Sequence, residues 1–219
     1  MDKKVYCLIM AGGEGKRFWP KGKKGLPKQF FAVDGKRSMV EITFKRMKKL
    51  VCEEKIFIVT NKKQSVLMKK EMSFLNQNSF ILEPFGRNTA AAIGLAALYL
   101  QLKDPRAVML VSPCDHFVRN NKKFSQAVNL AIKTAACNNL LVTIGIQPTY
   151  PNAEYGYIKI RKPQTNPSPK DKPAGQGGIV RGRQKIEDKK RDERDDIFRV
   201  ERFTEKPDRK TAGGFLKNG

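Results

Sequence analysis

A glycine-rich stretch near the N-terminus, 11–31, places the strongest constraint on how this chain can fold. It follows directly on Val5–Met10, a short apolar run rich in strand formers, which predicts a buried first strand. Glycines after a strand tip let the backbone approach a ligand, so that amide N–H groups can face an anion. Three glycines supply this loop: Gly12, Gly13 and Gly15. Arg17 and Lys28 add charge-assisted donors, as a polyphosphate ligand would require.

Two familiar phosphate-binding loops do not fit this stretch. A P-loop ends in Gly-Lys-Ser/Thr and has a further glycine five residues before its second glycine, but Arg17 follows Lys16, and Met10 occupies the earlier position. The dinucleotide-binding fingerprint requires a glycine where Phe18 stands, and no clear acidic strand end follows at the expected distance. A glycine-rich turn alone is also compatible with an ordinary strand-to-helix connection. The phosphate site is favoured by the residues that accompany the loop: Arg17, Trp19-Pro20 and 27–30.

Strand-like and helix-like segments alternate over the first two thirds of the chain. Apolar runs predict strands at 55–60, 79–83, 107–112 and 140–146, and helical periodicity predicts helices at 39–50, 61–75, 90–100 and 124–136. Ser38 is placed to cap the first helix, with Glu41 three residues on as a capping box. This alternation predicts right-handed βαβ units and a mainly parallel sheet covered on both faces. The expected fold is therefore a three-layer, Rossmann-like α/β architecture of the nucleotide-binding type.

The segment 84–89 leads into a helix that is apolar nearly all round, so we expect that helix to be buried and packed closely through its alanines and Gly94. Asn88 or Thr89 would cap the helix, and its N-terminus would then point free N–H groups out of a strand end toward a ligand. The alternative is an ordinary cap, with Arg87 as a surface charge.

The predicted strand 107–112 stops in Pro113-Cys114-Asp115-His116. A carboxylate just beyond the C-terminal end of a central strand is well placed to hold Mg²⁺, because open α/β sheets bind ligands in that crevice. Asp115 is accordingly the candidate metal ligand, and the alternative is that it caps the following turn. His116 is the only histidine in the chain, which excludes a multi-histidine metal site and favours a role in shaping the turn.

From Tyr150 onward the pattern changes to strands of alternating polarity. The segments 154–160 and 198–205 predict an antiparallel pair beside the parallel core, within one mixed sheet. Between them, 162–196 is rich in Pro, Gly and charged residues and has hardly any apolar ones, so we expect a disordered, solvated insertion. The chain 1–219 as a whole is long enough for one sizeable core, and we expect a single domain.

Charge and cysteine content restrict the partners and the compartment. The formal net charge is +23 over 219 residues, which favours polyanionic partners. Lysines are nevertheless spread through every helix-like segment, and no RNA-recognition signature, zinc-finger spacing or basic-leucine periodicity occurs, so we expect no nucleic-acid partner. The four cysteines show no paired spacing and three of them lie inside apolar stretches, so we expect buried, reduced thiols rather than disulfides, in a cytoplasmic protein. No apolar stretch reaches the roughly 18 residues of a membrane span, so no membrane partner is expected.

Several motifs occur in order along the chain. The opening stretch has Ala-Gly-Gly-x-Gly-x-Arg-Phe-Trp-Pro at 11–20 and Pro-Lys-Gln-Phe at 27–30. The later motifs are Glu-Pro-x-Gly-Arg-Asn-Thr-Ala at 83–90, Pro-x-Asp-His at 113–116, Gly-Ile-x-Pro-Thr at 145–149, Tyr-Gly-Tyr-Ile at 155–158 and Phe-x-Glu-Lys-Pro-Asp at 203–208. Together they resemble the motifs of mannose-1-phosphate guanylyltransferases, also called GDP-mannose pyrophosphorylases, within the sugar-1-phosphate nucleotidyltransferases. The resemblance covers essentially all of the chain except the insertion.

The resemblance implies transfer of GMP from GTP to α-D-mannose 1-phosphate, giving GDP-mannose and pyrophosphate, on a GT-A-like nucleotidyltransferase domain. It implies that Gly12, Gly13, Gly15 and Arg17 hold the triphosphate, that Lys28 stabilises charge at the reacting phosphates, and that Asp115 holds Mg²⁺. It also implies a set of nucleotide-facing and sugar-facing residues. Arg87, Asn88 and Thr89 line the nucleotide side, Gly156 and Glu205 face the sugar, and Lys206 faces the sugar's phosphate.

Some residues depart from the family pattern. Lys21-Gly22-Lys23 stands in place of the usual Leu-Ser-Arg, Cys114 replaces an alanine, and Asn152-Ala153-Glu154 replaces Glu-Thr-Gly. The chain ends at Gly219, just before the family's Trp-Asn-Ser-Gly segment, so we expect a C-terminally incomplete domain without a second metal carboxylate. The sequence leaves open whether the chain forms a homo-oligomer. The alternatives to guanylyl transfer are another sugar-1-phosphate nucleotidyltransferase, a non-catalytic nucleotide-binding fragment, and a polyanion-binding module.

Overall fold

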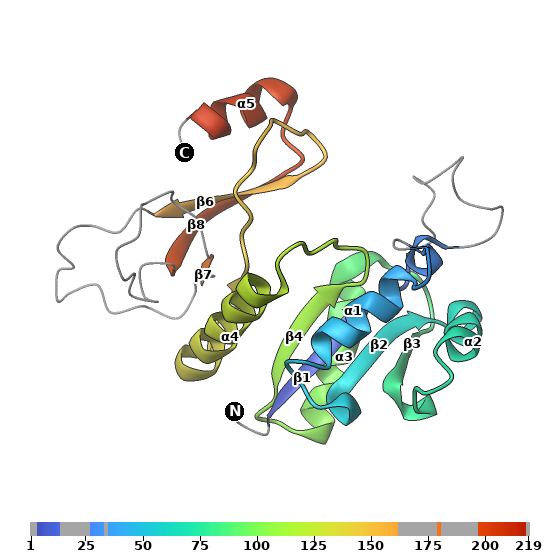
Figure 1. Ribbon diagram of the computed structural model, residues 1–219. Coiled ribbons are helices and arrows are strands. Elements are labelled where there is room, and N and C mark those ends of the chain that lie inside the picture. Colours follow the sequence, from blue (N-terminus) through green and yellow to red (C-terminus); the bar gives the residue numbers. More distant parts are fainter. Residues whose placement is uncertain (1–3, 14–26, 33–34, 162–178, 181–196, 218–219) are drawn as a thin grey trace. The chain divides into compact units, whose positions relative to one another are not determined.

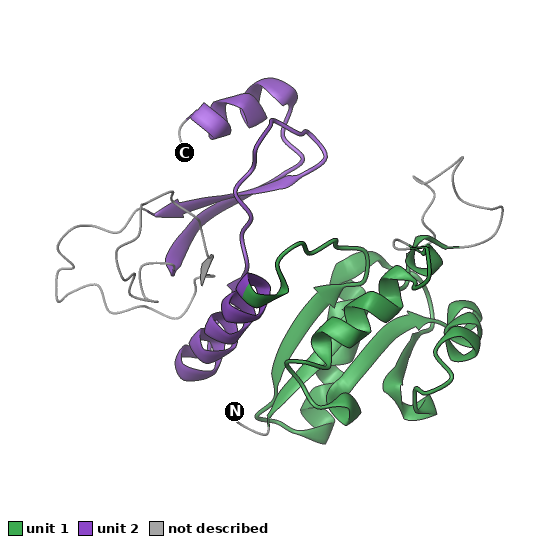
Figure 2. Cartoon of the chain, viewed as in Figure 1, with its two compact units in different colours: residues 1–122 green, residues 123–219 purple. Residues whose placement is uncertain are grey.

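The computed structural model describes residues 4–13, 27–32, 35–161, 179–180 and 197–217. Gly15 and Arg17, and nearly all of the expected insertion at 162–196, lie outside the described residues. The chain separates into two compact units, 1–122 and 123–219 (Figure 2). That the chain forms a single domain stays a prediction.

The first unit is built on a four-stranded parallel sheet (Figure 1). Its strands, in spatial order, are β3 (Phe80–Glu83), β2 (Ile56–Asn61), β1 (Val5–Met10) and β4 (Val108–Pro113). All four were expected from the sequence, and their ends differ from the expected ones by one residue at most. β2 shows why the pattern is informative, because its first five residues are apolar or β-branched and all five are buried. Such continuous runs are typical of parallel sheets that are covered on both faces.

The order of the strands reverses beside β1. The chain steps from β1 to β2 to β3 in one direction and then crosses back to β4, on the other side of β1. Leu8 therefore pairs with Phe57 on one side and with Val111 on the other. In open α/β sheets, ligands bind at such a reversal, outside the carboxyl ends of the strands. The segments that follow Met10 and Pro113 begin at this position.

Helices cover both faces of this sheet (Figure 1). α1 (Met39–Met47) and α2 (Lys62–Glu71) connect strands that step in one direction, whereas α3 (Asn88–Lys103) makes the return crossover and packs on the opposite face. The core beneath α3 joins alternate sheet residues to one side of the helix: Tyr6, Leu8, Phe57, Val59, Ile81, Ala92, Ala96 and Leu100. The expected three-layer α/β architecture is confirmed.

The expectation that α3 is buried nearly all round is wrong. Ala92, Ala96 and Leu100 are its buried residues, whereas Leu98 and Leu102 are 64% and 90% exposed. A helix that lies on a sheet buries only the side turned toward the strands. Leu95 is partly buried against the same core and the Tyr99 ring contacts Phe57, whereas Leu98 and Leu102 face outward.

The N-terminus of α3 also differs from the expectation of a cap at Asn88 or Thr89. Arg87 is the N-cap residue, with φ −121° and ψ 37°, and it makes no side-chain cap hydrogen bond. Asn88 has a left-handed φ of 64°. A capping side chain normally needs an extended backbone at the N-cap position to reach the amides of the first turn. Neither Arg87 nor Asn88 has an extended backbone. That this helix terminus faces a ligand stays a prediction.

The second unit contains most of α4 (Asn121–Asn138) and a small mixed sheet. The spatial order of the sheet is β5 (Val142–Thr143), β7 (Ile179–Val180), β8 (Phe198–Glu205) and β6 (Gly156–Arg161). β6 and β8 pair antiparallel, as expected, with an irregularity between Lys159 and Ile160. In the described part of the chain they belong to this second sheet and not to the parallel one, so the expectation of one mixed sheet is wrong. The expected strand at 140–146 shortens to the two residues of β5, and Leu141 and Ile146 on either side of it are 88% and 84% exposed.

A terminal helix in this unit was not expected from the sequence. α5 (Arg209–Lys217) follows Asp208, whose Oδ1 atom accepts a hydrogen bond from the Thr211 amide at 2.7 Å. This hydrogen bond lowers the pKa of Asp208 below its usual range. The Asp-x-x-Thr spacing is an ordinary helix start. Gly213 and Gly214 lie within the helix, and because glycine is a poor helix former they obscure the helical pattern of the sequence.

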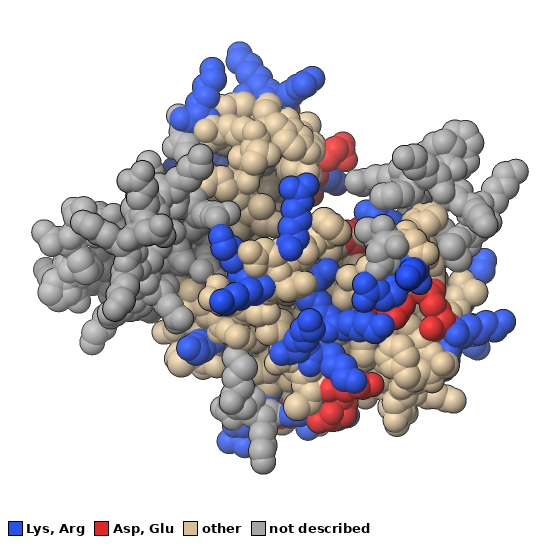
Figure 3. Space-filling view, viewed as in Figure 1, with Lys and Arg blue, Asp and Glu red and all other residues tan. Residues whose placement is uncertain are grey.

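Charged side chains are dispersed over the described surface. On the face drawn in Figure 3, lysines and arginines lie over several elements, with acidic residues among them. Some form ion pairs with acidic neighbours, such as Lys45 with Glu41 at 2.6 Å and Lys159 with Glu201 at 3.0 Å. The absence of a nucleic-acid partner stays a prediction. None of the helices in the described part of the chain has both the length and the apolar composition that a membrane crossing requires.

The four cysteines are free thiols. Cys7 and Cys114 are buried, and burial raises the pKa of each to about 12, so both are poor nucleophiles. Cys52 and Cys137 are exposed. The expectation of thiols rather than disulfides is confirmed, and burial is seen at two positions, fewer than the three cysteines that lie in apolar stretches of the sequence.

We expect Ser38→Ala to lower the free energy of unfolding by about 1 kcal/mol, because it removes the cap of α1. The hydroxyl oxygen of Ser38 accepts a hydrogen bond from the Glu41 amide at 3.3 Å, which confirms this half of the expected capping box. Urea denaturation followed by circular dichroism measures the change. Ser38→Thr keeps the hydroxyl and serves as the matched control. Equal midpoints for Ser38→Ala and the unmodified chain would show that the cap does not stabilise α1.

Candidate active site

The glycine-rich loop leaves β1 close to the end of β3. Ala11 first extends the strand pairing, because its amide donates to the Val59 carbonyl at 2.9 Å. A Cβ atom at Gly12 would then collide with Oε2 of Glu83 and lie 3.6 Å from its Cδ. A side chain at Gly12 would thus force Glu83 to move. A Cβ atom at Gly13 would have no described atom within 4 Å. The close approach expected of this loop is seen at Gly12, where the neighbour is a carboxylate.

Glu83 was not among the residues predicted for the site. It ends β3 beside the glycine-rich loop, it is half-buried, and burial raises the pKa of its carboxyl group. Within the described part of the chain, no hydrogen bond or ion pair engages its carboxylate. The sequence does contain a signal for Glu83, because this glutamate is the first residue of the motif at 83–90 and stands directly at a strand end.

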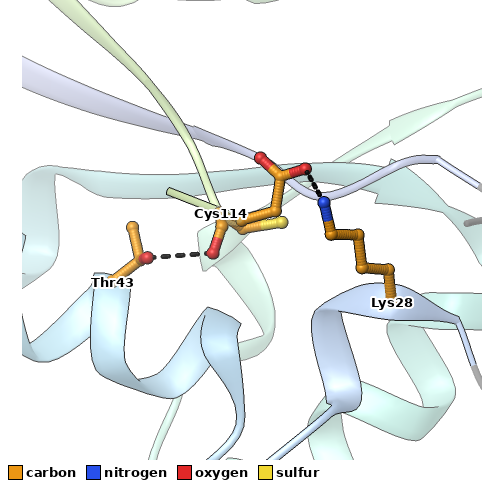
Figure 4. A network of polar contacts seen from close by, with 4 residues as sticks. Lys28, Thr43 and Cys114 are labelled. Carbon is orange, nitrogen blue, oxygen red and sulfur yellow. Dashed lines mark hydrogen bonds and ion pairs between the residues drawn. The ribbon is translucent and has the colours of Figure 1, made fainter. Parts of the chain in front are cut away.

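Lys28 and Asp115, both predicted for the site, are in contact. Lys28 begins the short 3-10 helix η2 (Lys28–Phe30), and its Nζ lies 2.9 Å from Oδ2 of Asp115, just after β4 (Figure 4). The two side chains are 27% and 37% exposed, so solvent and ligands can reach the pair. The pair therefore places one cation and one carboxylate at the reversal of strand order, where ligands bind in open sheets.

The backbone that carries Asp115 is fixed from two sides. The Cys114 amide donates to the Met10 carbonyl at 3.2 Å, and the Thr43 hydroxyl donates to the Cys114 carbonyl at 3.0 Å (Figure 4). The Arg46 guanidinium donates from both terminal nitrogens to the His116 carbonyl at 3.4 Å, and burial lowers the pKa of that guanidinium. Among the described residues no amide donates to the Asp115 carboxylate, so the alternative of a turn cap is not seen.

Other predicted residues are not brought to this pair by any described contact. Arg87, Asn88 and Thr89 are exposed at the start of α3, and their contact with a nucleotide stays a prediction. Gly15 and Arg17 lie outside the described residues. The role of His116 is consistent with shaping the turn, because its backbone carbonyl is held by Arg46 while its side chain is exposed.

The three residues predicted for the sugar phosphate lie together in the second unit. Gly156 pairs with Glu205 across β6 and β8, and a Cβ atom at Gly156 would lie 3.0 Å from Oε2 of Glu205 and 2.5 Å from the ring of Phe203. Lys206 follows with a left-handed φ of 42°, and its Nζ lies 3.7 Å from Oε1 of Glu205. The amide of Lys206 donates to the Tyr155 carbonyl at 3.1 Å. Phe203, which covers Gly156, was not predicted for this group.

A glycine-rich loop, a lysine and an aspartate at the strand-order reversal of a parallel sheet define a class of protein. They are the features of α/β proteins that bind phosphorylated ligands at the carboxyl edge of the sheet. The chain belongs to the nucleotidyl transferase family, whose model matches residues 6–219.

Individual relatives agree with that assignment. The chain is 36% identical over 216 residues to a mannose-1-phosphate guanylyltransferase of Salmonella typhimurium. It is 35% identical over 217 residues to a xanthan biosynthesis protein of Xanthomonas campestris. These alignments cover 97% and 98% of this chain but 39% of each relative, so the chain spans about two fifths of the length of the curated relatives it matches.

Two solved structures share the fold. A mannose-1-phosphate geranyltransferase from Thermus thermophilus is similar with a TM-score of 0.73 and 28% identity, over 99% of this chain and 54% of that one. A mannose-6-phosphate isomerase from Helicobacter pylori is similar with a TM-score of 0.67 and 29% identity, over 99% of this chain and 66% of that one. The expected nucleotidyltransferase fold class is thus confirmed.

We expect Gly12→Ala and Gly13→Ala to differ in stability. An alanine at Gly13 meets no described atom and should raise the free energy of unfolding by about 0.5 kcal/mol, because it restricts the unfolded chain. An alanine at Gly12 should show no such gain, because Glu83 must move aside. Urea denaturation measures both changes. In a Glu83→Ala background the gain at Gly12 should return, and its continued absence would contradict this explanation.

Proposed function

We propose that the chain transfers GMP from GTP to α-D-mannose 1-phosphate, with GDP-mannose and pyrophosphate as products. The observation that carries the proposal is the pair of Lys28 and Asp115, 2.9 Å apart at the strand-order reversal in a chain of the nucleotidyl transferase family. The choice of nucleotide and sugar is supported by relatives that are named mannose-1-phosphate guanylyltransferase.

The chemistry of this reaction suits the residues at the carboxyl edge. An oxygen of the sugar phosphate attacks the α-phosphorus of GTP, the bond from that phosphorus to the bridging oxygen breaks, and pyrophosphate leaves. The attacking oxygen is already an anion at neutral pH, so the chain needs no general base. Its task is to position the phosphates and to neutralise their charge. Lys28 neutralises charge at the reacting phosphates, and the glycine-rich loop with Arg17 holds the triphosphate.

Mg²⁺ belongs to the proposal, and Asp115 is the residue that would hold it. Within the described residues no cluster of three or more His, Cys, Asp or Glu side chains could bind a metal ion by itself. A single accessible carboxylate still fits Mg²⁺ that arrives with a triphosphate, because this ion keeps several waters and takes phosphate oxygens as ligands. When bound, the ion would neutralise charge on the phosphates.

Glu83 is proposed to select guanine. A carboxylate offers two acceptor oxygens, and guanine presents two adjacent donors on its Watson–Crick edge, the ring N–H and the amino group. Adenine lacks this pair of donors. The carboxylate of Glu83 stands beside Gly12 at the end of β3 and has no described hydrogen-bond partner, so its acceptors are available to a base.

Gly156, Glu205 and Lys206 are proposed to bind the sugar phosphate. The Glu205 side chain is 61% exposed, and its carboxylate can accept hydrogen bonds from sugar hydroxyls. The Lys206 ammonium, 3.7 Å from Glu205, can pair with the phosphate. We also propose a cytoplasmic location, because the free thiols fit a reducing compartment.

With Mg²⁺ and mannose 1-phosphate, we expect pyrophosphate release with GTP and little release with ATP, UTP, CTP or dTTP. Asp115→Asn should lower the rate by about a hundredfold or more. Asp104→Asn is the matched control, because Asp104 lies in the turn before β4, at the opposite end of the sheet. Release with a different nucleotide would keep the family reaction and reject the guanylyl assignment. No release with any nucleotide would overturn the proposed activity for this chain.

We expect Glu83→Gln to reduce the preference for GTP over ATP by about tenfold to a hundredfold, because one acceptor of a bidentate contact becomes a donor. The preference should also depend on pH. Burial raises the pKa of Glu83, so the carboxylate is protonated as pH falls through that raised pKa, and the affinity for GTP present above it is lost below it. Equilibrium binding of GTP and ATP from about pH 8 down to about pH 4, the ordinary range of a glutamate, measures both effects, with ATP as control for titration of the phosphates. An equal pH profile for both nucleotides would rule out Glu83 as the guanine contact.

A further inference from the structure

Three polar side chains are buried together beneath the end of β1. Gln29 in η2, Thr60 in β2 and Gln64 in α2 are 3%, 0% and 4% exposed. The two glutamines and the threonine come from three different elements, and neither Thr60 nor Gln64 belongs to any motif in the sequence. Burying polar groups is unfavourable unless their hydrogen bonds are made. The role of this cluster therefore depends on which groups its side chains bind.

Two of these partners are carbonyl groups of the glycine-rich loop. Nε2 of Gln29 donates to the Ala11 carbonyl at 2.9 Å, and Nε2 of Gln64 donates to the Gly13 carbonyl at 3.4 Å. Nε2 of Gln29 also donates to Oε1 of Gln64 at 2.8 Å. The Thr60 hydroxyl lies 3.0 Å from the Ala11 carbonyl and 3.1 Å from Oε1 of Gln64, and it donates its single hydrogen to one of them.

The donors and acceptors fit together in one way. A carbonyl oxygen only accepts, so Gln29 must turn its amino group toward Ala11, and the second hydrogen of that group goes to Oε1 of Gln64. Gln64 then has its own amino group left for Gly13. Turning over either amide would set oxygen against oxygen at the loop. The cluster therefore fixes its own orientation and holds the carbonyls on both sides of Gly12.

This arrangement directs the Gly12 amide. In a trans peptide the C=O of one residue and the N–H of the next point in opposite directions. Because the Ala11 carbonyl is held toward the buried cluster, the Gly12 N–H points away from it. We propose that Gln29 and Gln64 are positioning residues, which hold the glycine-rich loop so that the Gly12 amide faces a polyphosphate anion. The donor is then aligned before the ligand arrives and needs no reorganisation.

The inference rests on the proposed function only for the identity of its ligand, a nucleoside triphosphate. Inorganic tripolyphosphate contains the charged part of that ligand and neither base nor sugar. It is therefore the probe of choice, and it separates the positioning of the loop from the choice of GTP and mannose 1-phosphate.

The decisive variant is Gln64→Met, which has nearly the same volume and makes no hydrogen bond. We expect the Kd for tripolyphosphate to rise about tenfold in isothermal titration calorimetry, at a temperature where melting curves show both proteins folded. The affinity for guanosine should not change. In glycine-selective ¹⁵N spectra, the Gly12 resonance, assigned with Gly12→Ala, should shift on addition of tripolyphosphate in the unmodified chain and shift less in Gln64→Met.

Ser65→Ala is the matched control. Ser65 is the next residue of α2, it is 3% exposed, and its hydroxyl donates within the helix to the Lys62 carbonyl at 2.9 Å. It should lose some stability and keep the affinity for tripolyphosphate. Gln29→Met is a second variant on the same loop carbonyls. The double variant should bind no more weakly than the weaker single variant, because both residues act through one network.

A purely structural network would give a different result. Gln64→Met and Gln29→Met would then melt at lower temperature and bind tripolyphosphate as tightly as the unmodified chain, which would overturn the inference. A Gly12 resonance that does not respond to tripolyphosphate in the unmodified chain would overturn it as well. Tripolyphosphate binding that depends on Gln64, in a chain without guanylyl transfer, would support the inference and reject the proposed function.

Discussion

The position of β1 between β2 and β4 decides where the parts of the candidate site lie. All four strands are parallel, so their carboxyl ends share one edge, and the reversal of strand order at β1 sets the loop after Met10 beside the loop after Pro113. The first amide beyond each strand continues the pairing with its neighbour, from Ala11 to Val59 and from Cys114 to Met10. The glycine-rich loop and Asp115 therefore start from fixed backbone positions. The side chain of Lys28 can contact Asp115 from the neighbouring η2.

Two kinds of polar contact meet at this edge, and burial separates them. The amides of Gln29 and Gln64 are nearly inaccessible to water, so their hydrogen bonds are strong and costly to break. The ion pair of Lys28 and Asp115 has side chains 27% and 37% exposed, and such pairs typically contribute about 1 kcal/mol or less because solvent screens them. The buried hydrogen bonds suit a loop whose backbone stays rigid. The exposed ion pair suits side chains that exchange partners, as the proposed reaction requires.

The sequence predicted the parts of the fold that depend on local pattern. Continuous apolar runs located β1 to β4, and the carboxylate after the fourth run located Asp115. The outer side of α3 was not predictable, because alanine and leucine occur around the whole helix and periodicity does not tell which side meets the sheet. Gln64 was hidden in a similar way, since α2 is rich in polar residues and nothing local marks which of them turn inward. Glu83 opens the motif at 83–90, but it became a candidate site residue through its approach to Gly12.

The weakness of the Lys28–Asp115 pair suits the role that we propose for the two residues in phosphate chemistry. Both are attracted to parts of a metal-bound triphosphate, the ammonium to phosphate oxygens and the carboxylate to the metal ion. Under the proposed function, binding such a ligand would exchange one ion pair for two, with little free energy lost because the original pair is open to solvent. While no ligand is bound, each residue still holds the other near the strand-order reversal. The backbone of Asp115 cannot follow a displaced side chain, because Thr43 and Met10 bond the residue before it. Under the two proposals the movement would therefore be limited to side chains, while the Gly12 amide would stay where the buried glutamines hold the loop.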